Sequence, residues 1–527
     1  MNRKKISGMT ALVMLGISLC CPADALHAKA SNPIIQTSFT PDPAPVVFDD
    51  TLYVYTGCDR EGNNDFYYMT GYQCFSTTDM QNWTNHGTIM EDTDFSWGKE
   101  DSAWASQCIE RNGKYYFYVT MECKSGGGRG IGVAVADSPT GPFKDALGKP
   151  LCGPNWDYID PTVIIDNGQA WLMFGNPTCY YVKLKEDMLT LDGQIQHFEM
   201  NSASFGQSSK GSAYGEGPWI YKHGDLYYLV FASFYGNDGG ESMAYSTAPS
   251  VTGPWTFRGQ IMKSHNCFTT HGGIIDYKGK SYFFYHKNGL PGGGTFNRSA
   301  CVEEFEFNAD GTIPLLSPTD EGPKQTQYLD PYQRVEAETM SYSSGIKTEP
   351  IQVGTQAIGF IENGDYVKVS GVDFGDEGAT KFMASVASAG SGGTIEVHIN
   401  STTGPIVGVC DVPVTGDWQA WETVECNVMG ATGVHDLYLR FAGDESYLFN
   451  VDWWQFEGAE PAEIWQTGDT NNDGKINVCD MVIAKQILLE QNTDKSAVKA
   501  ADVNSDGNVT IADIIWYSKF LTAQVME

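Results

Sequence analysis

Five segments between Phe39 and Asp320 repeat one pattern, in which a turn-forming residue precedes a short run of aromatic and aliphatic residues. Helical periodicity is nearly absent from this region, so the runs are typical of strands in antiparallel sheets. They begin roughly 55 to 62 residues apart, enough for one four-stranded sheet each. Five such repeats predict a five-bladed β-propeller, whose radial closure protects the sheet edges. The runs are Leu52–Thr56, Lys114–Val119, Gln169–Phe174, Asp225–Phe231 and Lys280–Tyr285.

The repeat stops near residue 323, where the composition becomes polar. We expect a propeller over 31–322, a linker over 323–332, and a β-sandwich over 333–457, where strand-like runs alternate with Gly- and Asp-rich turns. A second linker covers 458–465, and residues 466–527 contain the helical periodicity. The predicted fold class is therefore mainly β, followed by a small α-helical module.

The first 30 residues have the pattern of a secretory signal peptide. Arg3, Lys4 and Lys5 form its basic end, Met9 to Leu19 its apolar part, and Ala28 to Ala30 a small-residue cleavage site. No later run reaches the roughly 18 apolar residues of a membrane span. We therefore expect a secreted, extracellular protein without a membrane span.

The charge of the chain restricts its partners. There are 65 Asp and Glu residues against 33 Lys and Arg, a formal net charge of -32. This charge argues against nucleic acid or an anionic membrane surface, because binding phosphate requires a cationic face. Aromatic residues make up 13% of the chain, which in a secreted acidic protein favours sugar binding, although ordinary sheet cores are also aromatic.

One twelve-residue pattern occurs twice near the C-terminus, about 33 residues apart. Oxygen-bearing side chains occupy positions 1, 3 and 5, Gly occupies position 6 and a carboxylate position 12, which is the spacing of an EF-hand calcium loop. A predicted helix follows each loop, at Met481–Leu489 and Ala512–Leu521. The expected calcium ligands are Asp469, Asn471, Asp473, Lys475 and Asp480 in the first loop, and Asp502, Asn504, Asp506, Asn508 and Asp513 in the second.

The paired loops resemble a dockerin, the module that attaches an enzyme to a cohesin on an extracellular scaffold, the cellulosome. The resemblance implies that loop positions 10 and 11 face the cohesin. These positions hold Val478-Cys479 and Ile511-Ala512, which are not the Ser-Thr pair of the best-known clostridial type, so the cohesin class stays open.

Three acidic residues stand beside Pro or Gly at predicted strand ends. They are Asp42 in Pro-Asp-Pro, Asp160 in Ile-Asp-Pro and Glu216 in Gly-Glu-Gly. Inner strand ends of a propeller converge on its axis, where paired carboxyl groups suit glycoside hydrolysis. One carboxylic acid protonates the leaving oxygen, a second carboxylate deprotonates water, and a third raises the pKa of the acid. Any one of them alone is equally an ordinary turn residue.

Residues 32–307 resemble a family-43 glycoside hydrolase, in the motifs Asp42-Pro-Ala-Pro, Ile159-Asp160-Pro-Thr and Glu216-Gly-Pro. The resemblance implies that Asp42 is the general base, Glu216 the general acid, and Asp160 the residue that tunes and positions Glu216. It also implies inversion of configuration, with the two catalytic carboxyl groups roughly 6.5–9.5 Å apart. By the same resemblance His271 contacts a structural cation or its water shell, and Arg298 hydrogen-bonds the substrate sugar.

Trp104-Ala-Ser-Gln107 resembles the branch of this family that removes arabinofuranose from arabinoxylan, with Trp104 as a pocket wall. We therefore expect an arabinoxylan-debranching α-L-arabinofuranosidase, which uses water and needs no organic cofactor. The alternatives within the family are β-xylosidase and arabinanase. The alternative outside it is a non-catalytic polysaccharide-binding protein.

The sandwich region resembles a family-6 carbohydrate-binding module, from Arg334-Val-Glu336-Ala-Glu338 through Asn363-Gly-Asp-Tyr366 to Asn450-Val-Asp452. The resemblance implies that Glu336, Glu338 and Asp452 bind a structural calcium ion. It further implies that Tyr366 and Trp421 enclose a sugar ring that Asn450 hydrogen-bonds. Trp418 fits the platform role as well as Trp421, and some relatives use a different cleft.

Overall fold

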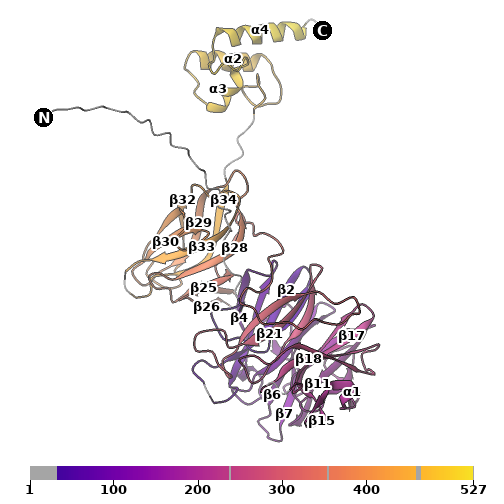
Figure 1. Cartoon of the computed structure of the whole chain (residues 1–527). Helices are drawn as coiled ribbons and strands as arrows, with labels where there is room; N and C mark the ends of the chain where they lie inside the picture. Colours follow the sequence, from indigo (N-terminus) through magenta and orange to yellow (C-terminus); the bar gives the residue numbers. More distant parts are fainter. Residues whose placement is uncertain are drawn as a thin grey trace, which may run out of the picture. The chain divides into compact units, whose positions relative to one another are not determined.

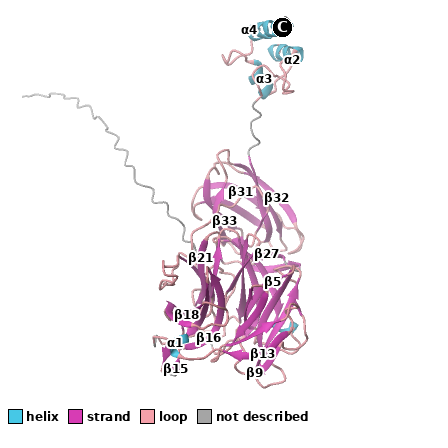
Figure 2. Cartoon of the chain, turned by 90° about the vertical axis from the view of Figure 1, so that its right-hand side faces the viewer, coloured by secondary structure: helices cyan, strands magenta, loops and turns pink. Residues whose placement is uncertain are grey.

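The computed structural model describes residues 32–525, except 64, 210, 237–238, 353–354, 445 and 459–464. The chain forms two compact units, one ending at Glu457 and one beginning at Gly458. Strands dominate the first unit and helices the second (Figure 2). The expected signal peptide at 1–30 and most of the expected linker at 458–465 lie outside the described residues.

The first part of the strand-rich unit contains five antiparallel sheets of three to five strands within the described residues (Figure 1). Their strands are β1 Ala44–Phe48, β2 Thr51–Asp59, β3 Met69–Thr77 and β4 Trp83–Glu91; β5 Trp104–Arg111, β6 Lys114–Glu122, β7 Arg129–Ala136, β8 Lys144–Asp145 and β9 Cys152–Asn155; β10 Thr162–Asp166, β11 Gln169–Phe174, β12 Tyr180–Leu184 and β13 Leu191–His197; β16 Tyr214–His223, β17 Leu226–Ser233, β18 Ser242–Ala248 and β19 Thr256–Met262; and β20 Gly273–Tyr277, β21 Lys280–Lys287 and β22 Ser299–Phe305. Smaller elements are η1 Asp92–Asp94, α1 Ser202–Phe205 and the pair β14 Gln207–Ser208 and β15 Gly211–Ser212.

Each aromatic run predicted from the sequence is the second strand of its sheet, namely β2, β6, β11, β17 or β21. The five strand predictions are therefore confirmed. A second strand has hydrogen-bonded neighbours on both sides and is covered on both faces. Large apolar side chains are favoured there because their burial contributes about 25 cal/mol per Å².

The first strands of successive sheets contact one another: β1 with β5, β5 with β10, β10 with β16, β16 with β20, and β20 with β1. The last sheet is also held by the chain N-terminal to β1. Ile34 N donates to Ala300 O of β22 at 2.9 Å, and Thr40 N donates to Arg298 O at 2.8 Å. The chain before β1 therefore runs along β22, the edge strand of the sheet β20-β21-β22, and covers part of that edge.

Two further sheets face each other across an apolar core that includes Trp454, Phe441 and Phe449, and they form a β-sandwich. One contains β26 Lys347–Gln352, β27 Thr355–Gly359, β34 Asn450–Gly458, β29 Ala379–Ala387 and β32 Glu422–Asn427, with β23 Val335–Glu336 beside β34. The other contains β25 Tyr342–Ser344, β28 Tyr366–Asp373, β33 Val434–Ala442, β30 Gly393–Ile399 and β31 Ile406–Val412. The short strand β24 Thr339–Met340 instead pairs with β4 as a fifth strand of the first sheet.

Residues 323–332, which we expect as a linker, are hydrogen-bonded on both sides. Gln325 Nε2 donates to Asp79 Oδ2 at 3.0 Å and to Ser370 O at 2.9 Å. Asn82 fixes the same junction directly, because its amide donates to Ser370 O at 2.9 Å and accepts from Ser370 N at 2.7 Å. This segment is thus a fixed connection and not a free tether.

The second unit contains α2 Val478–Leu488, α3 Lys495–Ala501 and α4 Ile511–Val525. The two predicted helices are confirmed, and both begin slightly earlier, inside their loops. At α2, Asn477 and Asp480 form a capping box that satisfies the first free N–H groups of the helix. The short α3 has too few residues for a clear periodic signal and was not predicted. None of the helices in the described part of the chain has the length and apolarity needed to cross a bilayer.

Candidate active site

Asp42, Asp160 and Glu216 line one cavity of about 330 Å³ in the strand-rich unit. Asp42 and Asp160 precede the first strands β1 and β10, and Glu216 lies in the first strand β16. The same ends of three first strands therefore bring together acids that are far apart in sequence. Other residues of the wall are Tyr67, Met69, Trp104, Arg129, Asn176, Glu241, Thr270, His271 and Arg298.

Two of these acids have a left-handed backbone conformation, with φ of 55° at Asp42 and 60° at Asp160. Such a conformation costs about 1–3 kcal/mol for a residue other than Gly and persists where surrounding contacts enforce it. Here Asp42 N donates to His286 Nδ1 at 3.2 Å, and Asp160 N donates to Thr120 Oγ1 at 2.9 Å. These two hydrogen bonds therefore hold the backbone of both residues in place at the cavity wall.

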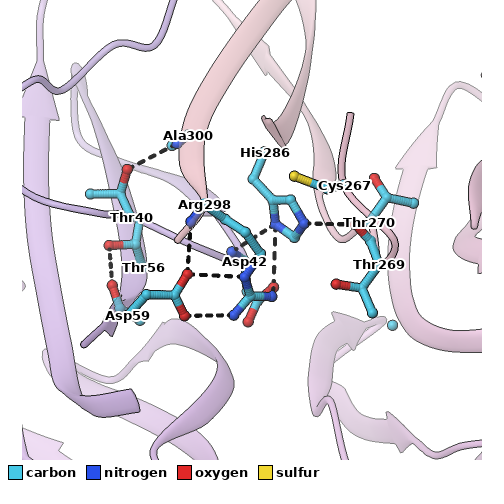
Figure 3. Close-up of polar contacts among 12 residues, drawn as sticks. Thr40, Asp42, Thr56, Asp59, Cys267, Thr269, Thr270, His286, Arg298 and Ala300 are labelled. Atoms are coloured by element: carbon cyan, nitrogen blue, oxygen red, sulfur yellow. Dashed lines mark hydrogen bonds and ion pairs between the residues drawn. The ribbon is translucent and has the colours of Figure 1, made fainter. Parts of the chain in front are cut away.

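Asp42 belongs to a buried network with Arg298, Asp59 and His286 (Figure 3). Arg298 Nη1 lies 2.9 Å from Asp42 Oδ1, while its Nε and Nη2 donate to Asp59 at 3.0 and 2.9 Å. Burial raises the pKa of Asp42, but the positive charge of Arg298 holds it well below its usual range. Asp42 is therefore ionised and able to accept a proton.

Glu216 and Asp160 show the opposite electrostatic behaviour. Burial and the nearby Asp42 carboxylate raise the pKa of Glu216, despite the hydrogen bond that its Oε2 accepts from Asn176 at 2.5 Å. Burial and the charge of Glu216 raise the pKa of Asp160 well above its usual range. Asp160 Oδ2 also accepts from Gly217 N at 2.9 Å, which fixes the backbone beside Glu216. The pair therefore retains a proton that the site can donate.

Three buried residues of this site were not identified from the sequence: Asp59, His286 and Glu241. Asp59 and His286 act on Asp42 through the contacts described above. Glu241 follows two glycines just before β18 and lines the cavity beside Glu216. None of the three stands in a motif that separates it from other loop and strand residues, so only the fold reveals them.

Aromatic side chains form the cavity walls. Trp104 Nε1 donates to Tyr67 O at 2.9 Å, which fixes its indole ring, and the Arg129 guanidinium lies 5.3 Å from the centre of that ring. Phe66, Phe234 and Phe268 line the same cavity with partly exposed rings. Aromatic faces of this kind suit the apolar face of a sugar ring.

His271 lines the cavity, and burial lowers its pKa to about 4, so its imidazole is neutral and can ligate a cation. Within the described residues no group of three or more His, Cys, Asp and Glu side chains has an arrangement that would hold a metal ion. A cation at His271 would therefore need ligands of another kind, such as water.

The three acids expected at a calcium site of the sandwich interact with one another. Burial and the charges of Glu336 and Asp452 raise the pKa of Glu338 to about 9. Glu338 Oε2 is buried and has no hydrogen-bond partner among the described residues. Arg334 partly neutralises the group, with Nε 2.8 Å from Glu336 Oε1 and Nη2 3.6 Å from Asp452 Oδ1. A buried carboxylate oxygen without a partner fits a calcium ligand.

Asn450 lies beside aromatic residues at one end of the sandwich. Its Nδ2 donates to Trp418 O at 3.0 Å, and its Oδ1 lies so close to Gly359 that a Cβ there would approach it to 2.9 Å. Phe360, the next residue, is 42% exposed, with its ring 5.6 Å from Tyr447. Asn450 thus contacts the backbone of Trp418 and of Gly359, next to Phe360, whose exposed ring was not identified from the sequence.

Tyr366 and Trp421, which are expected to enclose the sugar, do not both lie in the sheet that contains Asn450. Tyr366 begins β28 in the opposite sheet from Asn450, with its ring 6.1 Å from Tyr342 and 6.0 Å from Tyr438. Trp421 is half-buried just before β32. Because β28 and β34 belong to different sheets, Tyr366 and Asn450 begin strands on opposite sides of the sandwich core.

The two repeated loops have the same internal geometry. Asp469 accepts from Asp473 N and Gly474 N at 3.2 and 2.8 Å, and Asp502 accepts from the matching Asp506 N and Gly507 N at 3.1 and 2.7 Å. The position-12 residues Asp480 and Asp513 are fully buried and also accept backbone N–H groups of their loops. The oxygen donor set of each loop fits calcium, although the carboxylates are not drawn into a tight cluster.

Comparison with known proteins agrees with this organisation. Residues 30–313 match the model of glycosyl hydrolases family 43. The chain belongs to glycosyl hydrolase family 43. Residues 336–458 match the family 6 carbohydrate binding module and residues 467–522 the dockerin type I domain, so this family-43 glycoside hydrolase carries both modules.

Relatives of this family-43 enzyme share most of its length. It is 32% identical to an arabinoxylan arabinofuranohydrolase of Paenibacillus polymyxa, over 81% of this chain and 74% of the relative. It is 33% identical to an arabinoxylan arabinofuranohydrolase of Bacillus subtilis (strain 168), over 82% of this chain and 93% of the relative. The crystal structure of a family-43 arabinoxylan arabinofuranohydrolase from Bacillus subtilis in complex with cellotetraose superposes with a TM-score of 0.73 at 30% identity, covering 82% of this chain and 99% of that one.

Proposed function

We propose that this enzyme removes α-L-arabinofuranosyl side chains from arabinoxylan with inversion of configuration. The observation that carries the proposal is that one small cavity holds an ionised carboxylate, Asp42, and a carboxyl group with a raised pKa, Glu216. The similarity to two arabinoxylan arabinofuranohydrolases supports the substrate. A cavity of about 330 Å³ is at the small end of ligand pockets and suits one terminal sugar.

In the proposed reaction, the Glu216 carboxyl donates its proton to the glycosidic oxygen as the bond to the anomeric carbon breaks. Asp42 removes a proton from a water molecule, whose oxygen attacks the anomeric carbon from the opposite face. Asp160 accepts a hydrogen bond from Gly217 N and so holds the backbone beside Glu216, the acid with which it shares a proton in this proposal. Trp104 forms a wall for the sugar, and Arg298 keeps Asp42 ionised while it also faces the cavity.

We further propose that the five sheets are the blades of a five-bladed propeller with the cavity at its axis. Support comes from the order of the contacts, in which β20 contacts β1 as β1 contacts β5. It also comes from the hydrogen bonds of Ile34 and Thr40 to residues at β22.

In this proposal the other two modules attach the enzyme to its polysaccharide and to a scaffold protein. The sandwich binds hemicellulose, with calcium held by Glu336, Glu338 and Asp452, and the dockerin loops bind calcium and dock on a cohesin of a scaffold outside the cell. Matching residues at the starts of α2 and α4, Val478 and Ile511, are 57% and 67% exposed. Exposed apolar side chains at both loops support a protein partner there.

Proton NMR of wheat arabinoxylan incubated with the enzyme tests this function. We expect the arabinofuranosyl anomeric signals of the polymer to fall and free arabinose to appear first as the inverted anomer. The Asp42→Asn variant should leave the polymer unchanged. Release of xylose, or of arabino-oligosaccharides from arabinan, would instead indicate β-xylosidase or arabinanase activity. Binding of the polymer without hydrolysis would indicate a non-catalytic protein.

A further inference from the structure

The cavity contains one more carboxyl group than the proposed reaction uses. Glu241 is 4% exposed, and its position is fixed at two points. Its backbone N donates to Phe268 O at 2.9 Å, and its side-chain Oε2 accepts from Thr270 N at 3.2 Å. Oε1 lies against Gly215, where a Cβ would come within 3.1 Å of it. Glu241 therefore stands beside the backbone of the residue that precedes Glu216.

Part of this group is left without a protein partner. The buried Thr270 Oγ1 has no hydrogen-bond partner among the described residues, and the Glu241 carboxyl group has within them only the hydrogen bond that its Oε2 accepts. An unpaired buried polar group costs free energy that a partner would recover. Because both residues line the cavity, a ligand bound there is in a position to supply that partner.

A protonated Glu241 side chain has the hydrogen-bonding groups needed to bind a hydroxyl group. Burial and the charge of Glu216 raise the pKa of Glu241 well above its usual range, so the carboxyl retains a proton. A protonated carboxyl group both donates and accepts hydrogen bonds, and so does a sugar hydroxyl. A carboxylate would only accept.

We propose that Glu241 is a substrate-recognition residue, whose carboxyl group hydrogen-bonds a hydroxyl of the arabinofuranosyl unit bound beside Glu216. The assignment rests on the proposed function and adds a residue to it. Glu241 takes no part in proton transfer to the glycosidic oxygen. Its contribution is to hold the sugar in the cavity, with the Thr270 hydroxyl beside it.

The test compares kcat/KM for 4-nitrophenyl α-L-arabinofuranoside and its 2-, 3- and 5-deoxy analogues. Loss of a hydrogen bond to the sugar should lower kcat/KM of Glu241→Ala on the parent glycoside about 10- to 100-fold. At one deoxygenated position the wild type should lose a similar factor, while Glu241→Ala should lose little more. The loss caused by Glu241→Ala and the loss caused by removing that hydroxyl group would then reflect the same hydrogen bond.

Two variants control for packing. Glu241→Gln keeps a donor and an acceptor of the same size, so it should retain the preference for the hydroxyl. Glu186→Gln makes the same change in an exposed turn and should behave as the wild type. If Glu241→Ala does not fold, Glu241→Asp, which withdraws the carboxyl group by one methylene, takes its place in the comparison.

Equal deoxygenation losses in the wild type and in Glu241→Ala at all three positions would overturn the assignment, and would leave Glu241 with only the packing of Gly215. Failure of the proposed function looks different, because the wild type itself would then not cleave the parent arabinofuranoside. That result would overturn this inference as well.

Discussion

Arg298 divides its guanidinium group between two buried carboxylates, Asp42 and Asp59. The two ion pairs have different consequences. Asp59 accepts from Nε, Nη2 and the backbone N, which fixes the orientation of the planar group. The remaining nitrogen, Nη1, meets Asp42, so the geometry of the proposed base depends on a residue that does not line the cavity.

This arrangement predicts a pH effect. The double variant Asp59→Asn, Arg298→Met removes the cation beside Asp42. Asp59 is replaced as well, because without Arg298 its buried carboxylate would have no ion-pair partner. The pKa of Asp42 should then rise, because burial is no longer opposed by that charge. Since Asp42 acts when ionised, the acid limb of kcat/KM against pH should move to higher pH.

The matched control is Lys280→Met with Glu304→Gln, which removes a partly exposed ion pair of the last sheet. Its acid limb should coincide with that of the wild type. An unchanged limb in the Asp59 and Arg298 variant would mean that Arg298 does not set the protonation of Asp42.

A second prediction at the residue scale concerns the proposed general acid, Glu216. Glu216→Ala should lower kcat on arabinoxylan about 10²- to 10⁴-fold, because the sugar leaving group requires a proton. The loss should be smaller on 4-nitrophenyl α-L-arabinofuranoside, whose leaving group departs without one. Rates measured on both substrates give the comparison, and equal losses would contradict the acid role.

The acids that the sequence reveals are those with distinctive neighbours. Asp42 and Asp160 each precede a proline, and Glu216 stands between glycines. Asp59 has no such context, and the glycines before Glu241 belong to no recognisable motif, because what defines both residues is a partner more than 25 residues away in the chain. The residues expected to bind sugar in the sandwich show the same limit, because the sequence does not reveal that Tyr366 and Asn450 begin strands of different sheets.

At the scale of elements, the most predictable strands are those with hydrogen-bonded neighbours on both sides. β2, β6, β11, β17 and β21 are apolar and aromatic for that reason, whereas edge strands such as β13 are mostly exposed and give weaker patterns. The segment 323–332 shows what composition does not reveal about a connection. Its polar composition indicates a linker, but its polar side chains are used in hydrogen bonds between two packed regions.

The junction yields a stability prediction. Asn82→Ala removes the side-chain bonds that join Asp79, near β4, to Ser370 of β28. Because Ser370 N would lose its side-chain acceptor and Ser370 O one of its two side-chain donors, the free energy of unfolding should fall by about 1–3 kcal/mol. Thermal unfolding followed by calorimetry measures the change. Gln194→Ala, at an exposed strand position, should leave Tm unaltered, and an unaltered Tm for Asn82→Ala would show that the junction adds no stability.

At the scale of the whole molecule, the two units have different sources of stability. The strand-rich unit has extensive aromatic and aliphatic cores, while the small helical unit packs a few residues such as Ala484 and Tyr517 between two acidic loops. Each loop carries several carboxylates within twelve residues, and a bound cation offsets their mutual repulsion. Folding of the second unit is therefore expected to depend on calcium.

Chelation with EDTA should accordingly remove amide protection from residues 467–522 and leave the β2, β6, β11, β17 and β21 strands protected, as measured by hydrogen exchange. Asp480→Asn should weaken calcium binding by the first loop. Asp376→Asn, an exposed acid of the sandwich, should not. Full protection of the second unit in EDTA would contradict the calcium assignment.

The strand β24 has a consequence for how such enzymes are assembled from parts. It follows β23 within the sandwich region of the sequence, yet Thr339 and Met340 pair with Thr84 and Trp83. The boundary between the two family matches is therefore not a boundary in the folded protein. A recombination event that exchanged the binding module would also exchange this edge strand, so a hybrid keeps the pairing only where the incoming strand fits β4.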